Sequence, residues 1–334
     1  MSVALITGAT GLVGSHLVER LQREGWLLRA LVRDRSRAAW LSERGVELRD
    51  GDTRDEAAFT RAAHGVQFVF HCAAAITPRG GWEAYRAPNI DGTRNAVIAA
   101  AAAGARLLHL SSVAVYGPEG RSALTHGAGL QELQPLRPIP DWAWYARSKR
   151  ESEELVMAAH HAGRVWAAAV RPCVIYGPRD RQFVPRVASL LRLPLSPRIG
   201  DGRSVLSIVH ARSVAEVAVL AVTSEVGAGR AYNVTNDLPI TAGEFYEAAQ
   251  VGLGRRARFL PVPGALAQGA LAVAGAALRV LQVPGSSMLN SDSLDFLLKD
   301  NPFSSERARL DLGWTSTIDP HAAVAEAFGE ARAR

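Results

Sequence analysis

A short glycine-rich stretch near the start of the chain constrains its fold more than any other feature. Residues 3–7 (VALIT) form an apolar run typical of a buried strand, and residues 7–14 (TGATGLVG) lead from it into a helical segment. In such a turn Gly8 permits the sharp bend, Gly11 lets the backbone approach a phosphate group, and Gly14 lets the helix pack against the strand. Free N–H groups at the start of a helix attract phosphate. The placement between a strand and a helix therefore predicts a dinucleotide-binding turn rather than a purely structural bend.

Strand-like and helical segments alternate through the first half of the chain. Strands are expected at residues 3–7, 27–32, 46–49, 68–72, 106–110 and 167–171, and helices at residues 13–24, 89–103 and 145–160. This alternation predicts an α/β fold of the Rossmann type, with a doubly wound parallel sheet and helices on both of its faces.

The alternation weakens beyond about residue 175. Prolines and glycines cluster between residues 177 and 202, which suggests loops over a site, and residues 254–263 look like a break after a helix at 213–223. We therefore expect a dinucleotide-binding core over residues 1–175. A smaller C-terminal lobe over residues 176–334 would mainly bind substrate, with late segments returning to the core.

The end of the second expected strand bears on the choice of cofactor. The position that usually holds an acid for the ribose of NAD is Val32, and Arg33 follows it. An arginine can pair with the 2′-phosphate of NADP, so NADP is favoured. NAD stays possible if Arg33 is a solvated loop residue and Asp34 binds the ribose. Asp52, after the third strand, can accept a hydrogen bond from the adenine amino group; the alternative is a helix N-cap, a role that Asp55 fits better.

Tyr145 and Lys149 are spaced four residues apart in an expected helix, which places them on one face. A tyrosine with an ordinary pKa near 10 is a poor proton shuttle at neutral pH, whereas a nearby ammonium lowers that pKa. Tyr145 could then protonate a carbonyl oxygen or deprotonate an alcohol. Lys149 is one of only two lysines among 38 basic residues, which singles it out as a chemical requirement.

A hydroxyl follows the fifth expected strand, where ligands bind in parallel sheets. Ser112 in the stretch 111–117 (SSVAVYG) can hydrogen-bond the reacting oxygen beside Tyr145, and Ser111 is the competing assignment. The three expected catalytic residues are Ser112, Tyr145 and Lys149.

These residues together resemble the extended short-chain dehydrogenase/reductase family, which includes NAD-dependent epimerases and dehydratases. The motifs that carry the resemblance are TGATGLVG at 7–14, GDTRD at 51–55, HCAAA at 71–75, NIDGT at 89–93, SSVAVYG at 111–117, YARSK at 145–149 and RPCVIYGP at 171–178. The resemblance implies that Ala73, Ala74 and the stretch from Pro172 to Val174 border the cofactor, and that Asn89 stabilises the active-site backbone. The full set expected to bind the cofactor is Gly8, Thr10, Gly11, Leu12, Val13, Gly14, Arg33, Asp52, Thr53, Ala73, Ala74, Lys149, Pro172 and Val174.

The C-terminal half is most similar to the 3β-hydroxysteroid dehydrogenase and sterol-4-carboxylate 3-dehydrogenase branch of that family. The stretches 232–237 and 303–308 and the apolar segment 265–283 support this, while residues 29–34 resemble the NADPH-using dihydroflavonol reductases. Both likenesses imply an oxidoreductase acting on an apolar, ring-shaped ketone or secondary alcohol, such as a 3-hydroxy or 3-keto steroid. The apolar segment would line the site.

Two other functions compete with this reading. A sugar-nucleotide epimerase of the same fold would need cations for a diphosphate, and Arg198 and Arg203 could serve. A non-catalytic NADP-binding redox sensor is the second alternative. Dehydration is disfavoured, because related dehydratases carry an acidic pair where this chain has Val113 and Ala114.

Composition limits compartment and partners. Two cysteines, Cys72 and Cys173, make no disulfide framework, and no signal-like segment is apparent, so we expect a cytoplasmic protein in which both thiols are packing residues. The net charge of +6 is spread among acids, so no nucleic-acid partner is expected, and no spacing suggests a metal. The segment 265–283 favours a buried or site-lining helix over a membrane-surface contact or a true span. A homodimer is possible, without an interface signature.

Overall fold

A seven-stranded parallel sheet forms the core of the computed structural model, which describes residues 1–76, 80–118, 124, 130–236, 238–280 and 294–333. Its strand order is β10-β6-β5-β4-β1-β2-β3. The strands are β1 (Val3–Thr7), β2 (Leu27–Val32), β3 (Glu47–Asp50), β4 (Phe68–His71), β5 (Arg106–Leu110), β6 (Ala167–Pro172) and β10 (Ala231–Val234). The order reverses between β1 and β4, and the crevice at such a reversal is where open parallel sheets bind ligands. The predicted Rossmann-type fold is therefore confirmed.

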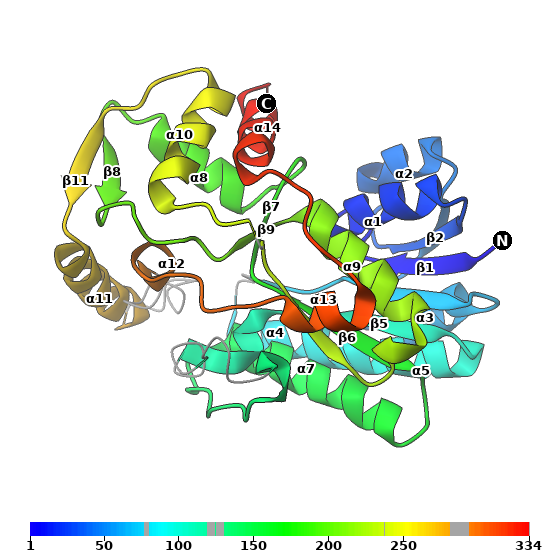
Figure 1. The fold of residues 1–334 in the computed structure, drawn as a ribbon. Helices are drawn as coiled ribbons and strands as arrows, with labels where there is room; N and C mark the ends of the chain where they lie inside the picture. The colour runs from blue at the N-terminus through cyan, green and yellow to red at the C-terminus, as the bar shows by residue number, and fades with distance from the viewer. Residues whose placement is uncertain (77–79, 119–123, 125–129, 237, 281–293, 334) are drawn as a thin grey trace.

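Helices cover both faces of this sheet (Figure 1). One layer contains α1 (Leu12–Arg23), α2 (Ala39–Glu43), α9 (Ala211–Thr223) and α13 (Glu306–Leu312). The other contains α3 (Glu56–Ala63), α5 (Gly92–Ala103), which a π-helical turn Ala87–Asp91 precedes, and α7 (Trp144–His161). Alternate side chains of one strand separate the two cores: Ile6 packs in the first layer, and Leu5 in the second.

The C-terminal lobe has an apolar core of its own. It comprises α8 (Phe183–Leu191), α10 (Ala242–Leu253) and α14 (Pro320–Ala333), with two-stranded pairs of β7 (Val174–Tyr176) with β9 (Ile208–His210) and β8 (Ser196–Ile199) with β11 (Phe259–Val262). Helices α4 (Glu83–Arg86), α11 (Gly264–Val280) and α12 (Asp295–Leu298) complete the described helices. Within the described residues no helix is long and apolar enough to cross a membrane.

Several expected boundaries need correction. The break expected at residues 254–263 contains strand β11, since Phe259 pairs with Ser196 of β8. Strand β10, in contrast, is a late segment that returns to the core as expected: it lies beside β6, with Tyr232 in register with Val170. The apolar segment expected at 265–283 is helix α11 as far as Val280, and its last three residues lie outside the described part of the chain. The expectation of a buried helix is wrong for residues 265–273, which are exposed or half-buried.

Candidate functional site

The glycine turn has little room for any side chain. Gly8 has a φ of +70°, and a Cβ placed on it would lie 2.8 Å from the backbone nitrogen of Ala73, which follows β4. A Cβ on Gly14 would lie 2.2 Å from the carbonyl oxygen of Gly8. The Gly11 N–H donates to that same oxygen at 2.8 Å. Gly14 thus packs α1 against the turn that follows β1, a refinement of the expected contact with the strand itself.

The start of α1 has features that favour the binding of an anion. Gly11 is its N-cap and supplies no side-chain cap, and no acidic residue lies in the first turn. The first N–H groups of a helix carry partial positive charge and lack partners within the helix. These features fit a dinucleotide pyrophosphate, which residues 8–14 would hold.

The adenosine end of the expected cofactor site lies at the ends of β2 and β3. The Arg54 side chain donates two hydrogen bonds to the Asp52 carboxylate, at 2.9 and 2.8 Å, and this pairing lowers the pKa of Asp52. Arg33 is 73% exposed and lies 3.8 Å from Asp52. Asp34 accepts hydrogen bonds from the backbone and hydroxyl of Ser36. Of the two charged side chains at the end of β2, Arg33 therefore makes fewer contacts within the protein than Asp34 does.

The competing capping role falls to Asp55, as expected from the sequence. Its carboxylate accepts a hydrogen bond from the Ala58 N–H at 3.0 Å at the start of α3.

The fold brings together the three residues expected at the chemical centre. Tyr145 lies at the start of α7, half-buried, and its phenol hydrogen-bonds the Ser112 hydroxyl beyond β5. Lys149 lies one turn further on, is only 3% exposed, and donates from Nζ to the Leu110 carbonyl at 2.6 Å. Ser111, the competing assignment, is buried beside Glu153 instead. The carboxyl end of β5 is thus the meeting point of all three groups.

The electrostatics of this centre differ from the expectation. Burial raises the pKa of Tyr145, an effect that the hydrogen bond from Ser112 opposes, and Lys149 is not among the groups that shift it. Burial also lowers the pKa of Lys149 to about 8, against the attraction of Glu153. The expected lowering of the tyrosine pKa by lysine is therefore absent in this structure, and burial is the dominant effect on the Tyr145 pKa instead.

Asn89 fixes the backbone around Tyr145, as the family resemblance implied. Its side chain accepts a hydrogen bond from the Ala75 N–H at 2.7 Å and donates to the Ala75 carbonyl at 2.9 Å. It also donates to the Ser148 hydroxyl at 2.9 Å, which in turn donates to the Tyr145 carbonyl at 2.9 Å. This chain of contacts ties the β4 loop to the first turn of α7.

His71 is a buried group that the sequence reading missed. It bridges Thr7 and Thr93, with Nδ1 2.9 Å from the first hydroxyl and Nε2 3.1 Å from the second. It stacks on His109 with ring centroids 5.9 Å apart. Burial lowers the pKa of His71 to about 3, so both hydroxyls face a neutral ring at neutral pH. The role of His71 is hard to predict from the sequence, because its partners Thr7, Thr93 and His109 lie on three separate elements.

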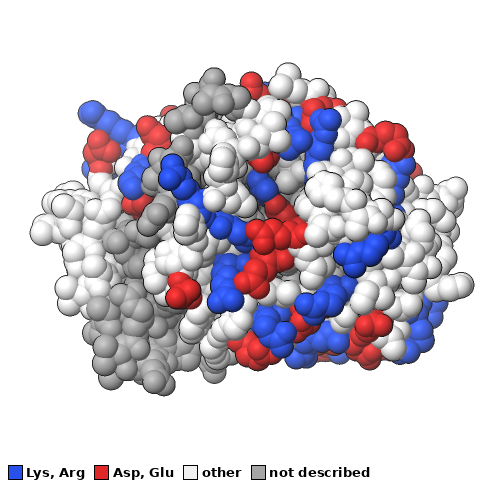
Figure 2. Space-filling model, turned by 90° about the horizontal axis from the view of Figure 1, so that it is seen from below, with Lys and Arg blue, Asp and Glu red and all other residues white. Residues whose placement is uncertain are grey.

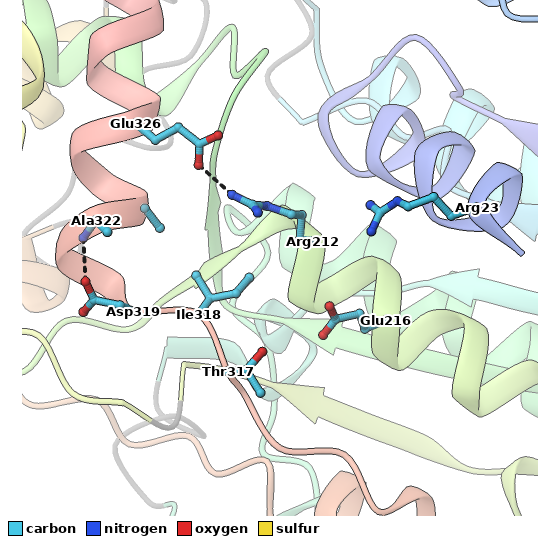
Figure 3. Close-up of a pocket in the computed structure, with 9 residues that line it drawn as sticks. Arg23, Arg212, Glu216, Thr317, Ile318, Asp319, Ala322 and Glu326 are labelled. Carbon is cyan, nitrogen blue, oxygen red and sulfur yellow. Dashed lines mark hydrogen bonds and ion pairs between the residues drawn. The ribbon is translucent and has the colours of Figure 1, made fainter.

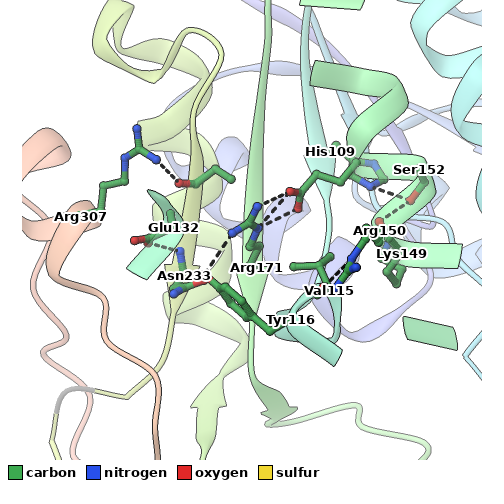
Figure 4. A network of polar contacts seen from close by, with 12 residues as sticks. His109, Val115, Tyr116, Glu132, Lys149, Arg150, Ser152, Arg171, Asn233 and Arg307 are labelled. Atoms are coloured by element: carbon green, nitrogen blue, oxygen red, sulfur yellow. Dashed lines mark hydrogen bonds and ion pairs between the residues drawn. The ribbon is translucent and has the colours of Figure 1, made fainter. Parts of the chain in front are cut away.

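A second missed group is a buried polar network behind α7 (Figure 4). Arg171 of β6 grips the Glu153 carboxylate with Nε at 3.1 and 3.0 Å, and the two side chains are 7% and 6% exposed. Arg171 also donates to the Tyr116 hydroxyl at 3.1 Å, which donates to Asn233 of β10 at 3.0 Å. Glu153 lies one turn beyond Lys149 on α7, so the pair anchors this helix to the sheet.

The remaining expected residues fall into two groups. Pro172 ends β6 and Val174 begins β7, so both lie at the carboxyl end of the sheet. Cys72 and Cys173 are free, and burial raises the pKa of each to about 12, which keeps both thiols protonated. Among the described residues no cluster of acids, histidines and cysteines could hold a metal ion.

A surface pocket lies apart from this centre (Figure 3). Its lining comes from α1, α9, α14 and the stretch before α14, and includes Arg23, Glu216 and Asp319. The Arg212–Glu326 ion pair spans it at 2.6 Å, joining α9 to α14. None of the expected site residues lines it.

A comparison with known protein families covers the glycine turn and the Tyr145 centre in one match. Residues 4–235 match the model of the NAD dependent epimerase/dehydratase family. The chain belongs to this family. The match ends just after β10, the last strand of the core sheet.

Curated relatives within the epimerase/dehydratase family are reductases and dehydrogenases. The chain is 33% identical to a ceramide reductase of Caulobacter vibrioides over 98% of this chain and 90% of that protein. It is 29% identical to a 2-alkyl-3-oxoalkanoate reductase of Stenotrophomonas maltophilia over 94% of both chains. It is 27% identical to a 3β-hydroxysteroid-dehydrogenase/decarboxylase of Arabidopsis thaliana over 94% of this chain, but only 59% of that protein. The protein is therefore an NAD(P)-dependent enzyme of the short-chain dehydrogenase/reductase type.

Solved structures with similar folds agree with the architecture described above. The crystal structure of gox2253 superposes with a TM-score of 0.76 at 28% identity, covering 100% of this chain and 98% of that one. A UDP-glucose-4-epimerase from Stenotrophomonas maltophila with bound NAD gives 0.77 at 20% identity, covering 100% and 98%. The second likeness shows the fold alone.

Proposed function

We propose that this protein transfers a hydride reversibly between a nicotinamide cofactor and a ketone or secondary alcohol. The observation that carries the proposal is the meeting of three groups beyond β5: the Tyr145 phenol on the Ser112 hydroxyl, with Lys149 buried one turn below. One proton donor, one hydroxyl and one cation around a single oxygen position suit the reduction of a carbonyl. When bound, the nicotinamide supplies or accepts the hydride.

In this proposal each residue has a separate task. Tyr145 gives its phenolic proton to the carbonyl oxygen during reduction and takes it back during oxidation. Ser112 donates a hydrogen bond to the same oxygen and holds it in place. Lys149, with its ammonium fixed on the Leu110 carbonyl, would bind the ribose of the nicotinamide beside Tyr145.

We also propose NADP as the preferred cofactor, with Arg33 as the group that binds its 2′-phosphate. Exposure of Arg33 at the end of β2 and its weak contact with Asp52 support the assignment, because its guanidinium is available to a ligand. Arg33→Ala should raise the KM for NADPH at least about tenfold and that for NADH little. Arg61→Ala, an exposed arginine on α3, is the matched control. Equal weakening of both cofactors by Arg33→Ala would refute the assignment.

For the substrate we propose a large apolar ketone or secondary alcohol. The ceramide reductase, the 2-alkyl-3-oxoalkanoate reductase and the steroid dehydrogenase/decarboxylase among the relatives share this character in name. A steroid is one member of the class, and long-chain keto lipids are another. Apolar sites with few polar groups select such molecules.

A cofactor-absorbance screen tests the proposal with both nicotinamides. The substrates are 3-hydroxysteroids, long-chain 3-oxo acids and ketones, dihydroflavonols, small ketones and UDP-sugars. Turnover of the apolar ketones and not of the small ones supports the proposal.

Epimerisation is the second candidate, and one observation favours it. The Nε atom of Arg198 on β8 is buried and has no hydrogen-bond partner among the described residues, as a phosphate-binding cation would be, whereas Arg203 is 90% exposed beside Asp201. Epimerisation of a UDP-sugar by the purified protein, with none of the ketones reduced, would replace the proposal by this alternative.

A further inference from the structure

The outer end of the C-terminal lobe carries exposed apolar side chains on three adjoining elements. Figure 1 shows β8, β11 and α11 together at one end of the molecule, away from the N-terminus. Leu195, Leu260, Leu266 and Val273 are 50%, 49%, 68% and 73% exposed. Single exposed apolar residues are ordinary, but a contiguous group rimmed by charge marks a binding surface.

The β8–β11 ribbon presents one of its faces to solvent. Ser196 and Phe259 lie opposite each other in register and turn inward, with Ser196 buried and Phe259 packed against the lobe core. Because side chains alternate along a strand, Leu195, Arg258 and Leu260 point outward. The exposures of these three residues agree with this alternation.

Helix α11, which follows β11 at this end of the lobe, carries a second apolar stripe. Leu266, Gly269, Ala270 and Val273 follow a helical spacing of three and four residues and are all exposed. The helix is held at its start, where a Cβ on Gly264 would meet the Leu298 side chain of α12 at 2.7 Å. A helix fixed at one edge with its apolar stripe in solvent suits a lipid interface.

The charge of the segments that form this surface is positive, which favours an anionic partner. Residues 181–200 contain four arginines, and residues 248–273 contain another three, and neither segment contains an aspartate or glutamate. Arg255 donates to the Arg192 carbonyl at 3.0 Å, which links the two segments, and Arg256 and Arg258 are exposed. Elsewhere arginines are interspersed with acids, as in Figure 2 and in the Arg147–Glu151 pair.

We propose that this surface docks on an anionic lipid bilayer. It is defined by Leu195, Arg256, Arg258, Leu260, Leu266 and Val273, and we call it the basic apolar face. Its arginines would lie over lipid phosphates while its leucines and valine enter the boundary between headgroups and acyl chains. The protein would then rest on the membrane without crossing it. Binding to lipid does not depend on the identity of the substrate, so this proposal stands apart from the proposed function.

Vesicle sedimentation of the full-length protein tests the proposal. Vesicles of phosphatidylcholine and phosphatidylglycerol in equal parts should retain at least about tenfold more protein than vesicles of phosphatidylcholine alone, and added salt should release it. Arg256→Glu with Arg258→Glu should abolish the preference. Arg61→Glu with Arg164→Glu makes the same charge change at exposed positions of the core and should preserve it.

A second pair of variants tests the apolar part. Leu266→Ser with Val273→Ser should weaken binding to the anionic vesicles severalfold. Val226→Ser with Leu310→Ser removes two side chains that are exposed at 44% and 69% on the core, and should not. Since all four positions are exposed, folding should survive, which circular dichroism checks. Equal sedimentation with both vesicle types, or equal losses in the test and control pairs, would overturn the proposal.

Discussion

At the scale of single residues, Tyr145 is the group on which the proposed chemistry depends most directly. Tyr145→Phe removes the exchangeable proton and the hydrogen bond to Ser112 but keeps the ring in place. We expect kcat to fall at least about a hundredfold, the usual contribution of a general acid, while the Kd for the nicotinamide changes little. Steady-state kinetics and cofactor titration measure the two effects.

The matched control is Tyr246→Phe, since Tyr246 is a half-buried tyrosine of α10 in the C-terminal lobe. It should leave kcat unchanged. Wild-type turnover in Tyr145→Phe would show that another group supplies the proton.

Lys149 gives a pH dependence whose direction follows from its ionisation. Burial lowers the pKa of Lys149 to about 8, so the ammonium is present below that pH and is lost above it. If the proposed role of Lys149 requires the charged ammonium, kcat/KM for ketone reduction should fall as the pH rises through about 8. A pH–rate profile of the wild type measures this limb.

The chain offers one other lysine as a control. Lys149→Met should abolish the reaction. Lys299→Met alters an exposed lysine paired with Asp295, and it should retain both the wild-type rate and the fall of kcat/KM above about pH 8. A profile that stays flat from neutral pH to well above about 8 would remove Lys149 from its proposed role.

At the scale of elements, local patterns predicted more than long-range pairings did. Strands β1, β2 and β5 begin and end at the residues expected from the sequence, because each is a largely apolar segment buried between two helical layers. Strands β7 and β9 have three residues each and exist because Val174 pairs with Ile208 across the sequence. No pattern in segments that short reveals such a pairing.

The site divides in the same way. The four-residue spacing of Tyr145 and Lys149 predicted that both lie on one face of the same helix. The contact of Arg171 with Glu153, and that of His71 with Thr7 and Thr93, join separate elements and depend on the completed sheet. Burial, which reverses the expected pKa shift of Tyr145, likewise arises only after folding.

The glycine turn supplies a prediction at this scale. In Gly14→Ala the new methyl group would meet the Gly8 carbonyl at 2.2 Å and the Ala9 Cα at 2.8 Å, and both are backbone atoms with little freedom to move. We expect α1 to shift, a loss of about 1–3 kcal/mol in the free energy of unfolding, and weaker cofactor binding. Denaturant titration and cofactor titration measure these losses.

Gly269→Ala is the matched control. It lies in helix α11, where a Cβ would meet nothing within 4 Å. Alanine favours a helix over glycine, so the substitution should leave stability unchanged or raise it by up to about 1 kcal/mol. Unaltered stability and cofactor affinity in Gly14→Ala would contradict the packing described for the turn.

At the scale of the whole molecule, the two lobes share polar contacts near the cofactor helix. Arg179, beyond β7, donates two hydrogen bonds to the Glu19 carboxylate of α1 at 2.8 and 3.0 Å, while its own backbone N–H donates to Glu330 of α14 at 2.6 Å. Its φ is +71°, an uncommon value for a residue other than glycine. These contacts join the helix expected to hold the cofactor phosphates to the last helix of the C-terminal lobe.

Four histidines are buried across this joined structure, and they make its stability depend on pH. His16, His71, His109 and His210 are at most 3% exposed. Burial lowers the pKa of His16 to about 4 and those of His71 and His210 to about 3, and lowers that of His109 well below its ordinary value. Lys149 adds repulsion at His71 and His109, and Arg179 and Arg212 add it at His16 and His210.

The sign of the effect follows from proton counts. Below about pH 6.5 these histidines are protonated in the unfolded chain and neutral in the folded chain. The unfolded state therefore binds more protons, and the free energy of unfolding decreases as the pH is lowered. Each histidine contributes on the order of 1.4 kcal/mol per pH unit in this range. We therefore expect the free energy of unfolding to drop by several kcal/mol between about pH 6.5 and pH 5, as urea titrations would measure. His16→Gln should make the decrease in the free energy of unfolding smaller, whereas the control His64→Gln, at an exposed position, should leave the decrease unchanged. A constant free energy of unfolding across this range would mean that the buried rings take up protons without unfolding.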